Sequence, residues 1–138
     1  MTSIYFAAPL FTAAERAWNA DCAEQLRAAL SATILVPQEF CAPCDQAEGG
    51  PDFGGIFTAC VEHLDRCSHV LAVLDGADPD SGTCWEAGYA YAKGLPVIGL
   101  RTDWRPAEDG SANCMLSRSC ASVVTDLAAA IAWFHQHS

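Results

Sequence analysis

The sequence predicts an α/β domain in which a doubly wound, five-stranded parallel sheet is covered by helices on both faces. Continuous apolar runs, rather than alternating ones, begin the chain at 4–8 and recur at 70–74, as is typical of parallel strands buried on both sides. Segments with helical spacing separate successive strands over the whole length. Because crossovers between parallel strands are right-handed, this alternation leaves little choice of architecture.

Local signals mark the element boundaries. Thr12 followed by Glu15 forms a capping-box pattern, Gly94 is expected to end a helix, and Thr125 is expected to cap the last one. The segment 38–54 lacks periodicity and contains Pro and Gly, which predicts a long loop of a functional or mobile kind. Strands are expected at 4–8, 34–36, 70–74, 96–100 and 121–124, helices at 13–30, 56–67, 83–93 and 126–135, and a helical turn at 113–119.

Five strands joined in this way favour the flavodoxin-like order 2-1-3-4-5. That order has its switch point between the first and third strands, where ligands bind outside the carboxyl ends. The segments 5–10 and 75–86 follow these two strands, so we expect them to meet in one crevice.

Size and charge restrict the classes of function. A chain of 138 residues is long enough for one domain with a self-sufficient core, here 1–138. The net charge of −10 leaves no basic patch, so nucleic acid polymers and anionic membranes are not expected partners. No apolar run approaches the ~20 residues of a membrane span, and the amino terminus lacks the features of a signal peptide. We expect a cytoplasmic protein.

The eight cysteines are scattered through apolar segments, which predicts mostly reduced, buried side chains rather than a disulfide framework. Cys41 and Cys44 alone have the spacing of a metal or redox pair. A zinc site needs four ligands, and no second such pair exists, so a loop with two incidental thiols is the favoured interpretation and no metal is expected.

The stretch 75–86 is the most informative part of the chain, because it follows a buried strand and leads directly into a helix. Two carboxylates facing one crevice favour chemistry at a sugar carbon. A solvated turn whose Ser81 or Thr83 caps the helix is the structural alternative. The acidic residues of this stretch are Asp75, Asp78, Asp80 and Glu86.

Four segments, at 4–11, 80–90, 96–98 and 113–115, occur in the order and spacing of one family, and the chain resembles a nucleoside 2-deoxyribosyltransferase. The most specific of them reads Asp-x-Gly-Thr-x-x-Glu-x-Gly, and the resemblance covers nearly the whole chain. It implies a flavodoxin-like subunit that moves a 2-deoxyribosyl group between nucleobases through a covalent glycosyl-enzyme, without a cofactor. The implied ligands are 2-deoxynucleosides and free nucleobases.

By position, the resemblance implies that Glu86 is the nucleophile at C1′ of the sugar, that Asp80 contacts the sugar, and that the Tyr5 hydroxyl positions the nucleophile. The chemistry agrees, because a carboxylate stabilises and then traps the oxocarbenium character that departure of a base creates. Glu86 lies near the amino end of its expected helix, which should keep it ionised near neutral pH. A glutamate that merely complements the helix dipole is the structural alternative.

The resemblance also implies binding residues. Gly82 belongs to the same motif, Gln38 corresponds loosely to a base-contacting position, and Asn113 corresponds to a residue inserted into a neighbour's active site. A homo-oligomer, dimer or higher, is therefore implied.

One position departs from the family pattern, because Cys60 stands where members typically have an aspartate. A thiol is a weak hydrogen-bonding group and stays mostly protonated near pH 7. Reduced activity and altered base preference are both open consequences, and Asp75 and Glu62 are candidates to supply the missing carboxylate.

Two alternative functions remain at this point. Water in place of a second base would make the protein an N-glycosidase of nucleosides or nucleotides. A nucleotide substrate needs a phosphate cradle after the first strand, and 7–11 offers none, which favours a free 5′-hydroxyl. The other alternative is a catalytically weak nucleoside-binding protein, because of Cys60.

Overall fold

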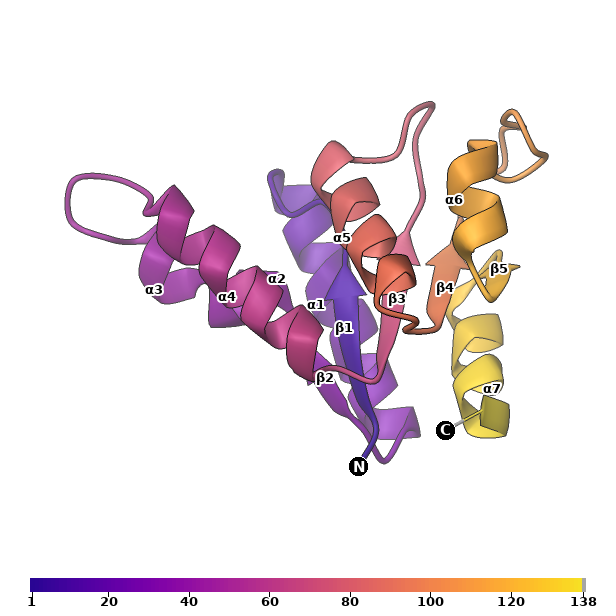
Figure 1. Ribbon diagram of the computed structural model, residues 1–138, viewed down its shortest axis with the longest axis horizontal. Helices are drawn as coiled ribbons and strands as arrows, with labels where there is room; N and C mark the ends of the chain where they lie inside the picture. The colour runs from indigo at the N-terminus through magenta and orange to yellow at the C-terminus, as the bar shows by residue number, and fades with distance from the viewer. Residues whose placement is uncertain (138) are drawn as a thin grey trace.

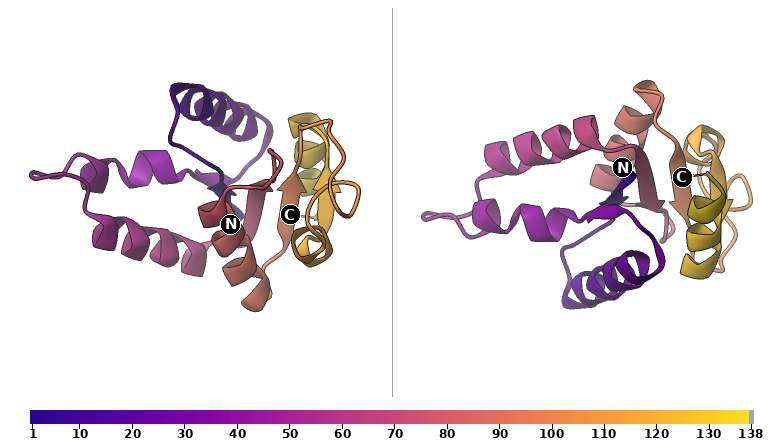
Figure 2. Two further views of the ribbon diagram at one scale, coloured as in Figure 1. Left: turned by 90° about the horizontal axis from the view of Figure 1, so that it is seen from above. Right: turned by 90° about the horizontal axis from the view of Figure 1, so that it is seen from below.

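The computed structural model describes residues 1–137 and contains a five-stranded sheet in which neighbouring strands run parallel. The strand order is β2-β1-β3-β4-β5, so the predicted order is confirmed. Helices lie on both faces of the sheet, as Figures 1 and 2 show. Along the chain the elements are β1 (Ser3–Ala7), α1 (Ala13–Ala29), β2 (Thr33–Leu35), α2 (Pro37–Phe40), α3 (Ala42–Asp45), α4 (Phe53–Arg66), β3 (His69–Val73), α5 (Ser81–Ala92), β4 (Val97–Leu100), α6 (Cys114–Ser119), β5 (Ser122–Val124) and α7 (Leu127–His137).

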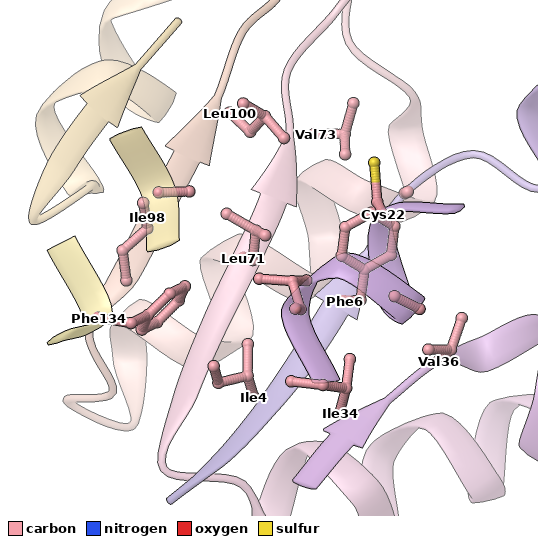
Figure 3. Packing of buried hydrophobic residues seen from close by; sticks show 14 of the residues in the cluster. Ile4, Phe6, Cys22, Ile34, Val36, Leu71, Val73, Ile98, Leu100 and Phe134 are labelled. Carbon is pink, nitrogen blue, oxygen red and sulfur yellow. The ribbon is translucent and has the colours of Figure 1, made fainter. Parts of the chain in front are cut away.

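Successive side chains of each strand alternate between two hydrophobic layers. In β1, Ile4 and Phe6 enter the layer that includes side chains of α1 and α7, which Figure 3 shows from close by. Tyr5 and Ala7 enter the opposite layer, with side chains of α4 and α5. Apart from Tyr5, the buried members of this second layer are aliphatic side chains and one cysteine. The two-residue period of a strand therefore turns Tyr5 toward α5.

The carboxyl ends of β1 and β3 lie side by side, because Ala7 is paired with Ala72 in register. The chain leaves β1 toward α1 and leaves β3 toward α5, and residues from both connections line one cavity. The prediction that 5–10 and 75–86 meet in one crevice is confirmed.

The prediction of a long loop at 38–54 is wrong, because this segment contains most of α2, all of α3 and the start of α4. Pro37 is the first residue of α2, a position that suits its fixed φ and missing N–H. The carboxylate of Asp52 caps α4 by accepting a 2.9 Å hydrogen bond from the Gly55 N–H, so this helix starts earlier than predicted. We call residues 42–66 the α3–α4 arm, which projects away from the sheet (Figure 1).

The sequence signals mark the start of α1 and the end of α5 correctly, but not the start of α7. Thr12 and Glu15 form the predicted capping box at the start of α1. Gly94 follows α5 with a φ of 75°, a conformation that glycine adopts without steric cost. At α7 the predicted cap Thr125 is wrong, because it is Asp126 that accepts the hydrogen bond from the Ala129 N–H, at 2.8 Å.

All eight cysteines are free. Cys22, Cys41 and Cys67 are buried, Cys114 is exposed, and the other four are half-buried. Within residues 1–137 there is no cluster of three or more His, Cys, Asp or Glu side chains arranged to hold a metal ion. No helix in the same range is long and apolar enough to cross a membrane.

Candidate active site

A cavity of about 630 Å³ opens at the carboxyl ends of β1 and β3. It is bounded by α5, by the connection from β1 to α1, and by the α3–α4 arm. Its charged side chains comprise three carboxylates and a single guanidinium, so the lining favours ligands rich in hydrogen-bond donors. The charged and polar side chains of the lining, thiols aside, are Arg16, Asp45, Gln46, Asp80, Thr83 and Glu86.

Two predicted site residues, Tyr5 and Glu86, are in direct contact. The Tyr5 hydroxyl donates a hydrogen bond of 2.6 Å to Oε1 of Glu86. The Tyr5 side chain is fully buried, and burial, together with the nearby Glu86 charge, raises its pKa above the ordinary value. The phenol therefore keeps its proton and acts as a donor, which leaves Oε2 of Glu86 available to a ligand.

Glu86 is less acidic than its expected place on a helix suggests. It is the sixth residue of α5, beyond the first turn where the helix dipole acts on a charge. Burial raises its pKa to about 7, and the Asp80 charge adds to this effect, whereas the hydrogen bond from Tyr5 acts in the opposite direction. The expectation that the dipole keeps this carboxylate fully ionised is therefore corrected, because desolvation is the larger effect.

Asp80 occupies the helix terminus and also lines the cavity. Its Oδ2 accepts hydrogen bonds from the backbone N–H of Thr83 at 2.9 Å and from the Thr83 hydroxyl at 3.0 Å. The structural alternative, in which Ser81 or Thr83 caps this helix, is wrong on that point, because Asp80 is the cap. Gly82 also lines the cavity, and a β-carbon there would lie 3.3 Å from Oδ2 of Asp80, so glycine keeps the approach to this carboxylate open.

Cys60 lies on the cavity wall beside the Tyr5 hydroxyl, and its sulfur is 3.8 Å from the sulfur of Cys41. Burial is the main cause that raises the pKa of both thiols, so they are protonated at neutral pH. The departure from the family pattern thus places a neutral group next to the pair of Tyr5 and Glu86.

The three aspartates of 75–80 line three different hollows. Asp75 lines a separate one of about 390 Å³ with Trp18. There its carboxylate accepts hydrogen bonds from the N–H and hydroxyl of Thr102, at 2.6 and 2.5 Å, and from the N–H of Asp103 at 2.8 Å. Asp78 lines a third hollow. Asp75 therefore joins two loops and is not brought to the cavity that holds Glu86.

Gln38 and Asn113 also lie outside the lining of this cavity. The Gln38 amide accepts a hydrogen bond from Asn19 at 3.1 Å and donates one to the Arg16 carbonyl at 2.9 Å, so it is fixed against α1. Asn113 caps α6 and lines the hollow of about 550 Å³ on another side of α5. Glu62 is exposed and does not line the Glu86 cavity.

Among charged and amide side chains of the site region, four escaped sequence reasoning, namely Arg16, Asp45, Gln46 and Arg101. Asp45 lines the cavity, but it falls in the segment that was expected to be a loop without structure. Arg101 is buried, and it donates hydrogen bonds to the carbonyls of Leu74 and Gly76 at 2.6 and 3.0 Å, which anchors the start of the acidic loop. An arginine directly after an apolar strand was the available signal for this second role.

Comparisons with known proteins identify the family of this chain. The profile of the family described as nucleoside 2-deoxyribosyltransferase matches residues 4–127. No match is found among curated protein sequences.

Three solved structures cover nearly the whole chain. A conserved protein from Enterococcus faecalis V583 is 30% identical with a TM-score of 0.87, and the match covers 100% of this chain and 99% of the other. A 2-deoxyribosyltransferase from Bacillus psychrosaccharolyticus is 25% identical with a TM-score of 0.78, covering 94% and 90%. A 2-desoxiribosyltransferase from Leishmania mexicana, 23% identical with a TM-score of 0.73 and 99% coverage of both chains, shares the fold. The chain belongs to the nucleoside 2-deoxyribosyltransferase family.

Proposed function

We propose that this protein transfers a 2-deoxyribosyl group from one nucleobase to another through a covalent ester on Glu86. The observation that carries the proposal is the 2.6 Å hydrogen bond from Tyr5 to Glu86 on the wall of the cavity. A buried phenol that cannot ionise holds one carboxylate oxygen in place and leaves the other free. Tyr5 is thus assigned the role of positioning the nucleophile.

The proposed reaction consists of two successive displacements at C1′. In the first, a Glu86 oxygen bonds to C1′, the C1′–N bond breaks, and its electron pair leaves with the base, which takes up a proton from water. In the second, a nitrogen lone pair of the incoming base attacks C1′, the ester C–O bond breaks and returns its electron pair to the Glu86 carboxylate, and the incoming nitrogen loses its proton to water. Two displacements through one carboxylate return the sugar with its original configuration.

Asp80 is assigned to the sugar. Its Oδ2 is engaged by Thr83, while Oδ1 makes no hydrogen bond to any residue within 1–137. A sugar hydroxyl that donates to this oxygen would sit beside Glu86, and bonds to sugar hydroxyls strengthen as charge develops at C1′.

The charge of the lining favours nucleosides over nucleotides. Three carboxylates repel a 5′-phosphate, and the guanidinium of Arg16 donates to the Leu10 carbonyl at 3.2 Å. We therefore infer substrates with a free 5′-hydroxyl.

Incubation with 2′-deoxyinosine or thymidine and free adenine tests the proposal. Transfer produces 2′-deoxyadenosine, whereas an N-glycosidase produces only free deoxyribose and base. A protein that binds nucleosides without turnover over a day is the third outcome. Glu86→Ala, whose fold is checked by circular dichroism, should abolish exchange, and a substantial residual rate in that variant would refute Glu86 as the nucleophile.

An oligomer is part of the proposal. The hollow that contains Asn113 also presents the largely exposed side chains of Tyr91 and Met115, an apolar pair that suits contact with a second copy. In such an assembly Asn113 would serve the neighbour's cavity rather than its own.

A further inference from the structure

The α3–α4 arm forms the outer wall of the cavity, and we propose that Asp45 and Gln46 on this wall recognise the nucleobase. They select bases with an amino group at purine position 6 or pyrimidine position 4, namely adenine and cytosine. Bases with a carbonyl oxygen there, namely hypoxanthine, uracil and thymine, are disfavoured. This inference rests on the proposed function, which places C1′ of the sugar at Glu86.

One side of the wall is a row of side chains on α4. Cys60, Ile56 and Phe53 are separated by four and three residues, so they share one face of the helix, and all three line the cavity. Cys60 lies beside Tyr5. The row therefore leads outward from the reacting centre and offers apolar surface to the flat faces of a base.

The second side is formed by the chain around α3. The Asp45 N–H donates to the Cys41 carbonyl at 3.0 Å, so Asp45 lies one helical turn, about 5.4 Å, beyond Cys41. The Cys41 sulfur contacts that of Cys60 at 3.8 Å, which places Cys41 at the inner end of the row on α4. The Asp45 charge also adds to the effect of burial that raises the pKa of Cys41 to about 12, an independent sign that the carboxylate is near. Asp45 thus lies about one helical turn outward from the contact between Cys41 and Cys60, on the same cavity as Glu86.

The polar groups at this outer position are available to a ligand. Within residues 1–137, the Asp45 carboxylate has no hydrogen bond or ion pair, and the side-chain amide of Gln46 has no hydrogen bond. Asp45 is half-buried, so an unpaired ligand atom facing it loses water contacts. Arg16 is the only cation in the described lining, and it faces a backbone carbonyl.

A carboxylate accepts hydrogen bonds and cannot donate them. The exocyclic amino group of adenine or cytosine can donate to Asp45, while the adjacent ring nitrogen accepts from the Gln46 amide. A carbonyl oxygen at the same position would instead face the carboxylate oxygens with no proton between them. Such a mismatch leaves polar groups unpaired, and we expect discrimination of about tenfold or more.

The test uses Glu86→Gln as background, because this variant holds a nucleoside without turning it over. Calorimetric titration with 2′-deoxyadenosine and 2′-deoxyinosine should give a dissociation constant at least about tenfold lower for 2′-deoxyadenosine. Adding Asp45→Asn should bring the ratio to about one or reverse it, because the Asn amide can rotate to donate to the carbonyl. Gln46→Ala should weaken 2′-deoxyadenosine selectively. Glu48→Gln is the matched control, since it makes the same chemical change on an exposed residue of the arm and should leave the ratio unchanged.

The inference is overturned if neither nucleoside binds, if the two bind equally, or if Asp45→Asn leaves the ratio unchanged. Base exchange by the wild-type protein is scored separately. Exchange without preference for amino bases removes this inference and keeps the proposed function. Selective binding of 2′-deoxyadenosine without exchange keeps this inference and removes the proposed function.

Discussion

Tyr5 and Glu86 are 81 positions apart in the chain, yet their side chains share a hydrogen bond of 2.6 Å. Tyr5 comes from the inner strand β1, and Glu86 comes from α5, which packs on the same face of the sheet. The bond therefore fixes the carboxylate relative to the sheet. The orientation of the proposed nucleophile depends on how α5 packs, and not on a flexible loop.

The rate of base exchange should rise with pH through neutrality. Only the ionised form of Glu86 attacks C1′, and burial raises its pKa to about 7. Below that value kcat/KM should fall by about tenfold per pH unit, and above it the profile should level off. Initial rates between pH 5 and 9 measure this. A profile that is flat from pH 5 to 7 would contradict the assignment.

Tyr5→Phe should shift this profile to higher pH. The hydrogen bond from Tyr5 stabilises the Glu86 carboxylate, so its loss raises the pKa of Glu86 further. The plateau rate should also fall, by about tenfold, because one carboxylate oxygen is no longer held. A variant whose rate falls while the midpoint stays unchanged would show that Tyr5 acts on packing alone.

Glu86→Gln should stabilise the fold in alkaline solution. Because the pKa of Glu86 in the folded protein lies above its ordinary value of 4.5, the folded state binds the proton more tightly than the unfolded state does. The free energy of unfolding therefore falls as pH rises from about 4.5 to 7, and the loss is complete above this window. A glutamine does not ionise and so avoids this loss. Urea unfolding at pH 8 should therefore show a free energy of unfolding higher by on the order of 2 kcal/mol in the variant. The gain should be small at pH 5, and Glu48→Gln should show none at either pH.

The cysteines should differ sharply in their reaction with iodoacetamide. Cys114 is exposed, whereas Cys41 is buried, and burial raises the pKa of its thiol to about 12. Since the thiolate is the reactive form, we expect Cys41 in the native protein to react at least about a hundredfold more slowly at pH 7.5. Peptide mass spectrometry after timed quenching gives both rates. Equal labelling of the two would indicate that the α3–α4 arm opens readily.

Mixing two inactive variants tests the role of Asn113. If Asn113 completes a neighbour's cavity, Glu86→Ala and Asn113→Ala subunits together form some sites with both wild-type groups. Activity should then exceed that of either variant alone. Glu86→Ala mixed with Tyr5→Phe is the control, because both lesions act within the subunit that carries them. Native mass spectrometry that finds mixed oligomers without regained activity would contradict this role.

The sheet could be predicted because its signals are local. Each strand is a short apolar run bounded by turn residues, and the capping box at Thr12 and Glu15 marks the start of α1. The segment 37–45 was harder to predict, because α2 and α3 have only four residues each and carry no full helical period. Their structure depends on turns centred on Pro37 and Cys41 and on contact with α4.

The site was predictable only in part. The family motif singled out Glu86, Asp80 and Tyr5 as candidates, and the structure brings Tyr5 into contact with Glu86 and places Asp80 on the same cavity. The direction in which a loop side chain points cannot be read from spacing, which is why Asp75 was grouped with them. Its carboxylate is engaged by backbone N–H groups after β4, a non-local pairing that leaves no pattern in the sequence.

The projection of the α3–α4 arm from the sheet separates two tasks. The bond at C1′ is proposed to form and break where α5 packs against β1. The choice of base is proposed to depend on the α3–α4 arm, which projects from the sheet. Residues at the outer end of this arm can be substituted with little effect on global stability. The architecture is therefore suited to engineering. A library of variants confined to the outer end of the arm would change which acceptor bases are used, while Tyr5, Asp80 and Glu86 stay unchanged.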